Sequence, residues 1–225
     1  MNTMKTLALA AAFTASAGAQ AVTFDFTCYG ANGCTEASYA YPTFSKTVGG
    51  ITVTVLPGSA GDGTPRVWQD SKGLGVSDAD FRGELDFNYN TVHRGEWLEF
   101  QFSQQVTIGT LGLEDWVDNS DRTQVSFGGG TAGAGSFIIG PSEGTQVDGI
   151  DLFNLAITGS ISWLRVTPQT NTGSGETDFY VQRLGNVNAF VAPPPPPPPV
   201  PVPAAAWLMG SALVGLSAVA RRRRV

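Results

Sequence analysis

Apolar residues in the central part of this chain recur at every second position, which is the periodicity of β-strands. In the segment GITVTVL, Ile51, Val53 and Val55 fall on one face and the threonines fall on the other. The longest example is GEWLEFQF, at residues 95–102, where Leu, Phe and Phe alternate with Trp, Glu and Gln. No stretch of this region keeps an apolar period of 3.6 residues over ten positions. The pattern therefore disfavours a parallel sheet with crossover helices.

Further short segments of the same kind predict an all-β fold. They occur at VTFDF, GELDFNYN, TQVSF, SFIIG, LAITG, SWLRVT and DFYVQRL, and Gly, Asn, Asp or Pro turn signals separate most of them. About eight to ten antiparallel strands in one domain predict a two-sheet sandwich, jelly-roll-like in arrangement. Residues 22–192 are long enough for one such domain. The glycine-dense segment Val125 to Phe137 lacks the lysine of a phosphate-binding loop, so we interpret it as a flexible strand connection.

Residues 1–21 have the order of parts of a secretory signal peptide. Lys5 supplies an early positive charge, an apolar run follows at residues 7–13, and small residues precede the expected cleavage after Ala21 or, alternatively, Ala19. The other interpretation is an N-terminal core helix, but the apolar run is too short to span a membrane and matches a signal sequence better. We therefore leave residues 1–21 out of the folded domain.

The region between the two ends is strongly acidic. The chain has 13 Lys and Arg residues, 19 Asp and Glu residues and a formal net charge of −6. Lys5 and the four arginines at 221–224 lie at the ends, which leaves 8 basic against 19 acidic residues, a net charge of −11, between them. This charge disfavours nucleic acid as a partner, because phosphate backbones would be repelled. Calcium or a neutral, hydroxyl-rich surface is a more favourable partner for this acidic region.

The two cysteines predict a local disulfide. Cys28 and Cys34 enclose YGANG, whose residues favour a tight turn, and an exported protein meets an oxidising environment. Because the loop is short, the disulfide should contribute only about 2 kcal/mol. A metal pair or a catalytic thiol is the less favoured interpretation, since no second ligand pair lies near and the only histidine is His93.

Catalytic motifs are not evident. His93 lies in a predicted hairpin connection and the chain has no G-x-S-x-G segment, so we predict that the protein is not an enzyme. Two acidic runs, at 78–86 and 114–121, offer oxygen ligands for a structural calcium ion, although neither matches an EF-hand loop. Solvated loop acids are the favoured alternative, and a carboxylate pair of a secreted hydrolase is a remote one. The candidate calcium ligands are Asp78, Asp80, Glu84 and Asp86.

Three tryptophans are candidate carbohydrate contacts. Trp97 lies on the polar side of its strand with Glu99 and Gln101, and Trp68 and Trp116 lie in loop-like contexts. Large aromatic side chains with polar neighbours form contact surfaces at low entropic cost. The alternative is that the fold covers these rings, as a sandwich can do with a loop.

The C-terminal part resembles a spacer followed by a membrane segment. Residues 193–203 are mostly proline, which predicts a semi-rigid polyproline II spacer. Residues 204–225 begin with 17 uncharged residues, which as a helix reach about 25 Å and make a marginal membrane span. The arginine cluster that follows orients the C-terminus to the cytoplasm and the body to the outside. Its members are Arg221, Arg222, Arg223 and Arg224.

The tail VPVPAAAWLMGSALVGLSAVARRRR resembles the PEP-CTERM sorting signals, in particular the variant with VPLPA in place of Pro-Glu-Pro. The resemblance implies export, an inner-membrane intermediate with the body in the periplasm, and processing by an exosortase before release to the cell surface of a Gram-negative bacterium. The resemblance also implies that the mature protein is associated with exopolysaccharide. A permanent membrane anchor is the alternative. The implied sorting motif is Val200, Pro201, Val202, Pro203 and Ala204, with Val202 where the variant has leucine.

The body has a weaker resemblance to exosortase-dependent surface proteins, over Gly73 to Leu113 and Glu176 to Gly185. It implies a sandwich-like fold and carries no catalytic residue. We therefore expect a non-enzymatic protein of the cell surface or extracellular matrix, without a cofactor unless calcium binds. A carbohydrate-binding module is the main alternative for the body.

Overall fold

The computed structural model describes residues 20–28, 39–59, 64–77, 85–87, 95–114, 116, 122–140, 144–147, 150–169, 177–196 and 207–214. Within these ranges the chain is antiparallel β-sheet with one short helix, at residues 207–214. The all-β class predicted from the period of two is confirmed. By its contacts the chain divides into two units, Met1–Phe190 and Val191–Val225, which are treated separately below.

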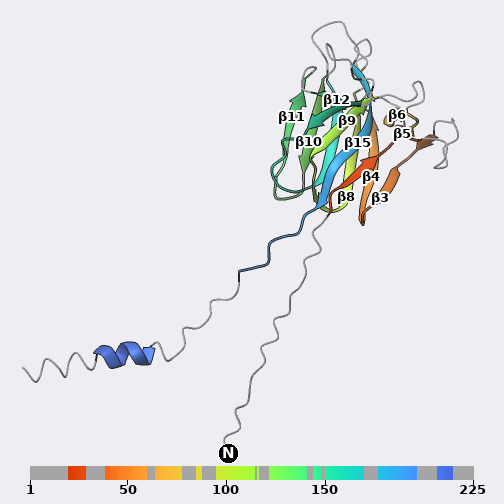
Figure 1. The fold of residues 1–225 in the computed structure, drawn as a ribbon. Coiled ribbons are helices and arrows are strands. Elements are labelled where there is room, and N and C mark those ends of the chain that lie inside the picture. The colour runs from red at the N-terminus through yellow and green to blue at the C-terminus, as the bar shows by residue number, and fades with distance from the viewer. Residues whose placement is uncertain are drawn as a thin grey trace, which may run out of the picture. The chain divides into compact units, whose positions relative to one another are not determined.

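The first unit contains all of the described strands (Figure 1). In chain order they are β1 (Val22–Asp25), β2 (Tyr39–Tyr41), β3 (Phe44–Val48), β4 (Ile51–Ser59), β5 (Arg66–Gln69), β6 (Leu74–Ser77), β7 (Leu85–Phe87), β8 (Glu96–Thr107), β9 (Thr110–Glu114), β10 (Thr123–Gly128), β11 (Gly135–Ile139), β12 (Thr145–Val147), β13 (Ile150–Asn154), β14 (Ile161–Pro168) and β15 (Thr177–Ala189).

The strands pair in two runs that β15 connects. One run has the order β11, β10, β14, β8, β4, β3. The other has the order β12, β13, β9, β15, β6, β5, β2, and β1 and β7 also pair with β15. The last residues of β15 pair with β8, so this long strand connects the two runs. Every one of these pairings is antiparallel.

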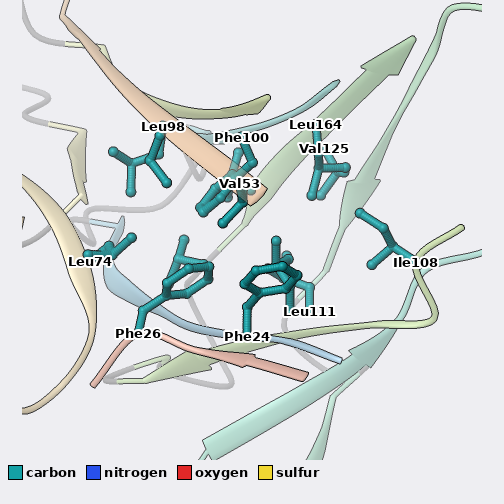
Figure 2. Packing of buried hydrophobic residues seen from close by; sticks show 14 of the residues in the cluster. Phe24, Phe26, Val53, Leu74, Leu98, Phe100, Ile108, Leu111, Val125 and Leu164 are labelled. Atoms are coloured by element: carbon teal, nitrogen blue, oxygen red, sulfur yellow. The ribbon is translucent and has the colours of Figure 1, made fainter. Parts of the chain in front are cut away.

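The core is built from the inward-facing residues of both runs (Figure 2). Val53, Leu98 and Phe100 come from the first run, and Phe24 and Phe26 come from β1 and the residue after it. The rings of Phe26 and Phe100 lie 5.6 Å apart between centroids, so side chains from the two runs are in direct contact. The alternation predicted for residues 51–55 and 98–102 is confirmed, since their apolar members are buried and their polar members are not.

The glycine-dense connection between β10 and β11 is fixed to the segment before β14. The amide of Ala132 donates to the carbonyl of Ser160 at 3.0 Å, and the Ser160 amide donates to the Thr131 hydroxyl at 2.8 Å. The buried Ser160 hydroxyl donates in turn to the Gln105 side chain at 2.9 Å. The sequence predicts a flexible connection here. The structure shows it hydrogen-bonded to Ser160, because its glycines let the backbone approach that residue closely.

The second unit contains the helix at residues 207–214, whose side chains are all exposed. Among the residues that the structure describes, no helix is long and apolar enough to cross a membrane. The remainder of the predicted membrane segment, the sorting motif at 200–204 and the arginines at 221–224 lie outside the described residues. The predicted signal peptide lies outside them as well, up to residue 19.

Candidate functional site

The side of β8 and β14 that points away from the core carries polar and aromatic side chains. On β8 the inward Leu98 and Phe100 alternate with outward residues, and β14 repeats the pattern around Leu164 and Val166. The two strands are adjacent and antiparallel, so their outward residues form one continuous surface. We call it the β8–β14 face, and it comprises Trp97, Glu99, Gln101, Trp163, Arg165 and Thr167.

An ion pair lies at the centre of the β8–β14 face. Arg165 and Glu99 are opposite each other in the strand register, and the Arg165 Nη2 and Nε donate to Glu99 Oε2 at 2.6 and 3.1 Å. The other Glu99 oxygen accepts a hydrogen bond of 2.8 Å from the Gln101 amide. Both oxygens of this carboxylate are therefore engaged, and the two charges compensate each other. The centre of the face is electroneutral.

Trp97 is enclosed between a glycine and this ion pair. Its ring lies over Gly58, the opposite residue on β4, where an added Cβ would be only 2.0 Å from two indole carbons. The Arg165 guanidinium also lies over this ring, 4.1 Å from the ring centroid. Trp97 is on the polar side of its strand, as predicted, but its ring does not offer an open stacking surface.

Trp163 is a member of this surface that the sequence reasoning missed. It is half-buried on β14, opposite Gln101 on β8 and Gly128 on β10. Its ring lies over Gly128, where an added Cβ would be 2.9 Å from an indole carbon. No cation and no second ring is recorded over Trp163 within the described residues. The signal that could have found it is the alternation in SWLRVT, where Trp163 and Arg165 fall on the side opposite to Leu164 and Val166.

The other two candidate tryptophans are not on the β8–β14 face. Trp68 lies on β5 in the other run of strands, and its indole N–H donates to Asp70 at 3.2 Å. Trp116 is 6% exposed, and its ring contacts Phe153 and Phe179 at centroid distances of 5.1 and 5.6 Å. This placement makes Trp116 a core residue, because apolar rings from two distant strands surround it. It is not available to a sugar.

The other predicted sites lie mostly outside the described residues. Asp78, Asp80 and Glu84 are among these, and Asp86 is described only as a backbone position of β7. In the part of the chain that the structure describes, no three His, Cys, Asp or Glu residues are placed to hold a metal ion, and the calcium site stays a prediction. Cys28 is disulfide-bonded, and the chain's other cysteine, at position 34, is not described.

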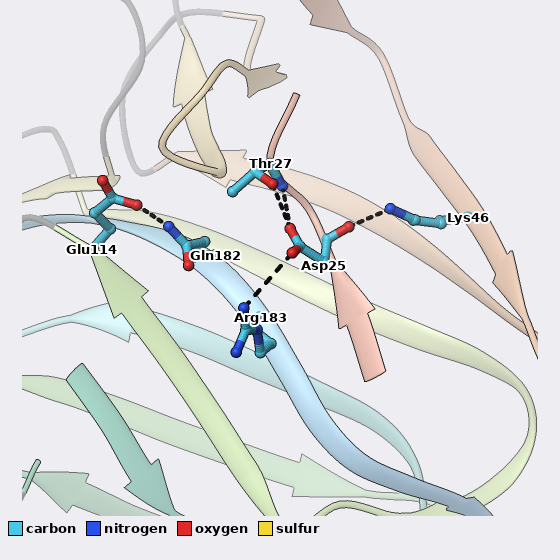
Figure 3. Close-up of polar contacts among 6 residues, drawn as sticks. All are labelled: Asp25, Thr27, Lys46, Glu114, Gln182 and Arg183. Carbon is cyan, nitrogen blue, oxygen red and sulfur yellow. Dashed lines mark hydrogen bonds and ion pairs between the residues drawn. The ribbon is translucent and has the colours of Figure 1, made fainter. Parts of the chain in front are cut away.

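A second polar cluster connects β1, β3 and β15 (Figure 3). The Asp25 carboxylate accepts hydrogen bonds from the Thr27 amide and hydroxyl at 2.9 and 2.6 Å, and lies 3.7 Å from an Arg183 nitrogen. Lys46 donates to the backbone carbonyl of Asp25. Nearby, the amide of Gln182 donates to Glu114. The Lys46 and Arg183 contacts hold the first strand against β3 and β15, so we interpret the cluster as structural.

Replacing Asp25 with alanine is expected to lower the free energy of unfolding by about 1 kcal/mol, because it removes both hydrogen bonds to Thr27. Asp25→Asn is the matched control, since its amide oxygen can still accept those bonds while the charge near Arg183 is lost. Exposed ion pairs contribute little, so we expect a loss of only a few tenths of a kcal/mol for the asparagine variant. Urea unfolding measures both. An equal loss in the two variants would assign the stabilisation to the charge instead.

Comparisons with known proteins give no match. No protein-family model matches the chain, and no curated sequence or solved structure matches it. Function is therefore inferred from the residues and their geometry. The β8–β14 face offers a compensated charge pair, the Gln101 amide, the Thr167 hydroxyl and the half-buried Trp163 indole.

Proposed function

We propose that this chain is an exported, non-enzymatic protein of the bacterial cell surface or extracellular matrix, sorted by an exosortase and associated with exopolysaccharide. The observation that carries the sorting part is the C-terminal order of VPVPA motif, apolar segment and arginine cluster. The signal peptide pattern at residues 1–21 supports export independently. The two features orient the body to the same side of the inner membrane.

The described part of the tail supports a transient contact with the membrane. The helix at residues 207–214 exposes large apolar side chains, which favours burial in lipid or in a processing enzyme over exposure to water. The segment is short for a permanent anchor, whereas a signal needs to be held only until the exosortase recognises it. The exposed apolar residues are Trp207, Leu208, Met209, Leu213 and Val214.

For the body, we propose a two-layer sandwich with a jelly-roll-like arrangement. The two runs of strands and the core contacts between them, such as Phe26 with Phe100, support this architecture. Association with polysaccharide is supported by the β8–β14 face, with its half-buried Trp163 and compensated Glu99–Arg165 pair. A hydrolase is less favoured, because Glu99, the acid of this face, has both oxygens engaged.

Intact-mass measurement tests the sorting proposal. Protein recovered from the surface of the native host is expected to lack both the signal peptide and the C-terminal residues 221–224, because both segments serve only as sorting signals that are removed by processing. The control is the same chain with all four arginines replaced by glutamine, which should accumulate unprocessed because its orientation signal is lost. Mature surface protein that still carries Arg221 to Arg224 would refute processing and favour a permanent anchor.

A further inference from the structure

A row of outward-facing residues crosses five neighbouring strands. Ser45 on β3 is opposite Thr54 on β4, which is opposite Gln101 on β8. Gln101 is opposite Trp163 on β14, which is opposite Gly128 on β10. We call these five residues the cross-strand row. With about 4.8 Å between strands, it extends about 19 Å at right angles to them.

The chemistry of the cross-strand row changes from hydroxyl to amide to aromatic ring. The hydroxyls of Ser45 and Thr54 are hydrogen-bonded to each other at 3.2 Å, so one of them can still donate a hydrogen bond and both can still accept. The exposed Gln101 contributes an amide beside them. The Trp163 ring lies over Gly128. Because glycine has no side chain, the ring can lie flat against the sheet. Hydroxyl and amide groups next to an indole complement a pyranose, which has hydroxyls at its rim and C–H groups on its faces.

The charge distribution around the cross-strand row favours an uncharged ligand. None of its five residues is ionisable, and the two charges of the adjacent row, Glu99 and Arg165, are paired at 2.6 Å. The body around it carries a net charge of −11 between the two ends of the chain. The negative charge of the body would repel an anionic polymer, and the row has no cationic side chain to bind it. A neutral polymer meets no such barrier.

We propose that the cross-strand row binds a neutral, extended polysaccharide of pyranose rings, with one ring stacked on Trp163 and others further along the row hydrogen-bonded to Gln101, Thr54 and Ser45. The strand spacing is close to the length of one pyranose unit, so successive sugars meet successive strands. The proposal rests on the extracellular setting of the proposed function and names its ligand class. Trp97 has a different role: beneath Arg165 it holds the ion pair that keeps the face neutral.

The matched pair Trp163→Ala and Trp97→Ala tests this assignment in the full chain. Each removes an indole that lies over a glycine of a neighbouring strand, but only the Trp97 ring has the Arg165 guanidinium over it. Affinity electrophoresis in hydroxyethylcellulose is the measurement, and carboxymethylcellulose supplies the same backbone with negative charge. We expect Trp163→Ala to weaken binding to the neutral polymer by roughly tenfold or more, and Trp97→Ala to change it by about twofold at most. The wild-type chain should prefer the neutral polymer.

A second pair keeps the test decisive if loss of a tryptophan unfolds the chain. Thr54 and Thr52 are both half-buried on β4, and each faces a hydroxyl of β3, at 3.2 and 2.8 Å. Only Thr54 belongs to the cross-strand row. We expect Thr54→Ala to weaken binding about fivefold and Thr52→Ala to leave it unchanged, because one hydrogen bond to the ligand is lost in the first variant alone.

The outcomes separate this inference from the sorting proposal. Equal weakening by both tryptophan variants, equal weakening by both threonine variants, or tighter binding to carboxymethylcellulose overturns the cross-strand row as the site. Failure of the wild-type chain to bind either polymer overturns it too, while export and processing are decided separately by intact mass. Dimerisation that depends on Trp163, seen by size-exclusion chromatography without glycan, would identify a second copy of this chain as the occupant.

Discussion

Replacing Phe100 with alanine is expected to lower the free energy of unfolding by about 4 kcal/mol. This value lies within the range found when buried Phe residues of protein cores are replaced by alanine. Phe100 is 0% exposed on β8, and its ring contacts Phe26, which belongs to the segment after β1. The substitution removes apolar surface from the centre of the core and leaves a cavity between the two runs of strands. Urea unfolding followed by tryptophan fluorescence measures the shift in midpoint, with an unchanged m-value indicating a change in native stability alone.

Phe127→Ala is the matched control for Phe100. Phe127 lies on β10 and is only partly buried, and its ring is 6.2 Å from that of Phe137 between centroids. Its truncation should cost about half as much, since part of the ring already faces water and the site can collapse. If the two variants lose equal stability, the contact between the two runs at Phe100 does not have the central role assigned to it.

The period of two predicted the strands and their inward faces, but not their neighbours. Alternation assigns Leu98 and Phe100 to the core and Glu99 to the outside whatever strand lies beside them. Which strand pairs with β8 is decided by contacts far apart in sequence, and Glu99 meets Arg165 at a separation of 66 residues. The β8–β14 face, including Trp163, therefore appears only once the register of the two strands is known.

Trp116 and Trp97 show a second limit of sequence reasoning. Trp116 follows β9 with no alternating pattern around it, so nothing local indicates that Phe153 and Phe179 enclose its ring. Trp97 was correctly placed on the polar side of its strand, but outward direction does not establish that a ring is uncovered. Gly58 and Arg165, from strands on either side, determine that it is not. Exposure of an aromatic ring is a property of its neighbours across the sheet.

The largest backbone effect is expected at Gly130, in the connection between β10 and β11. A Cβ at this position would lie 2.1 Å from the carbonyl oxygen of Ser160, which accepts the hydrogen bond from Ala132. Because the neighbour is backbone and not the end of a flexible side chain, the connection must move away. That movement breaks the Thr131–Ser160 hydrogen bonds as well. We expect Gly130→Ala to lower the free energy of unfolding by about 3 kcal/mol, combining overpacking with lost hydrogen bonds.

Gly133→Ala, in the same connection, separates this clash from backbone strain. Gly133 has a φ of +72° and no atom within 4 Å of an added Cβ, so alanine meets only the cost of a left-handed conformation, about 1 kcal/mol. Hydrogen exchange of the Ala132 and Thr131 amides provides the local readout: both should lose protection in Gly130→Ala and keep it in Gly133→Ala. Equal stability losses with protected amides in both variants would mean that the connection is not anchored on Ser160. In that case the close approach permitted by Gly130 has no role in holding β10 and β11 against β14.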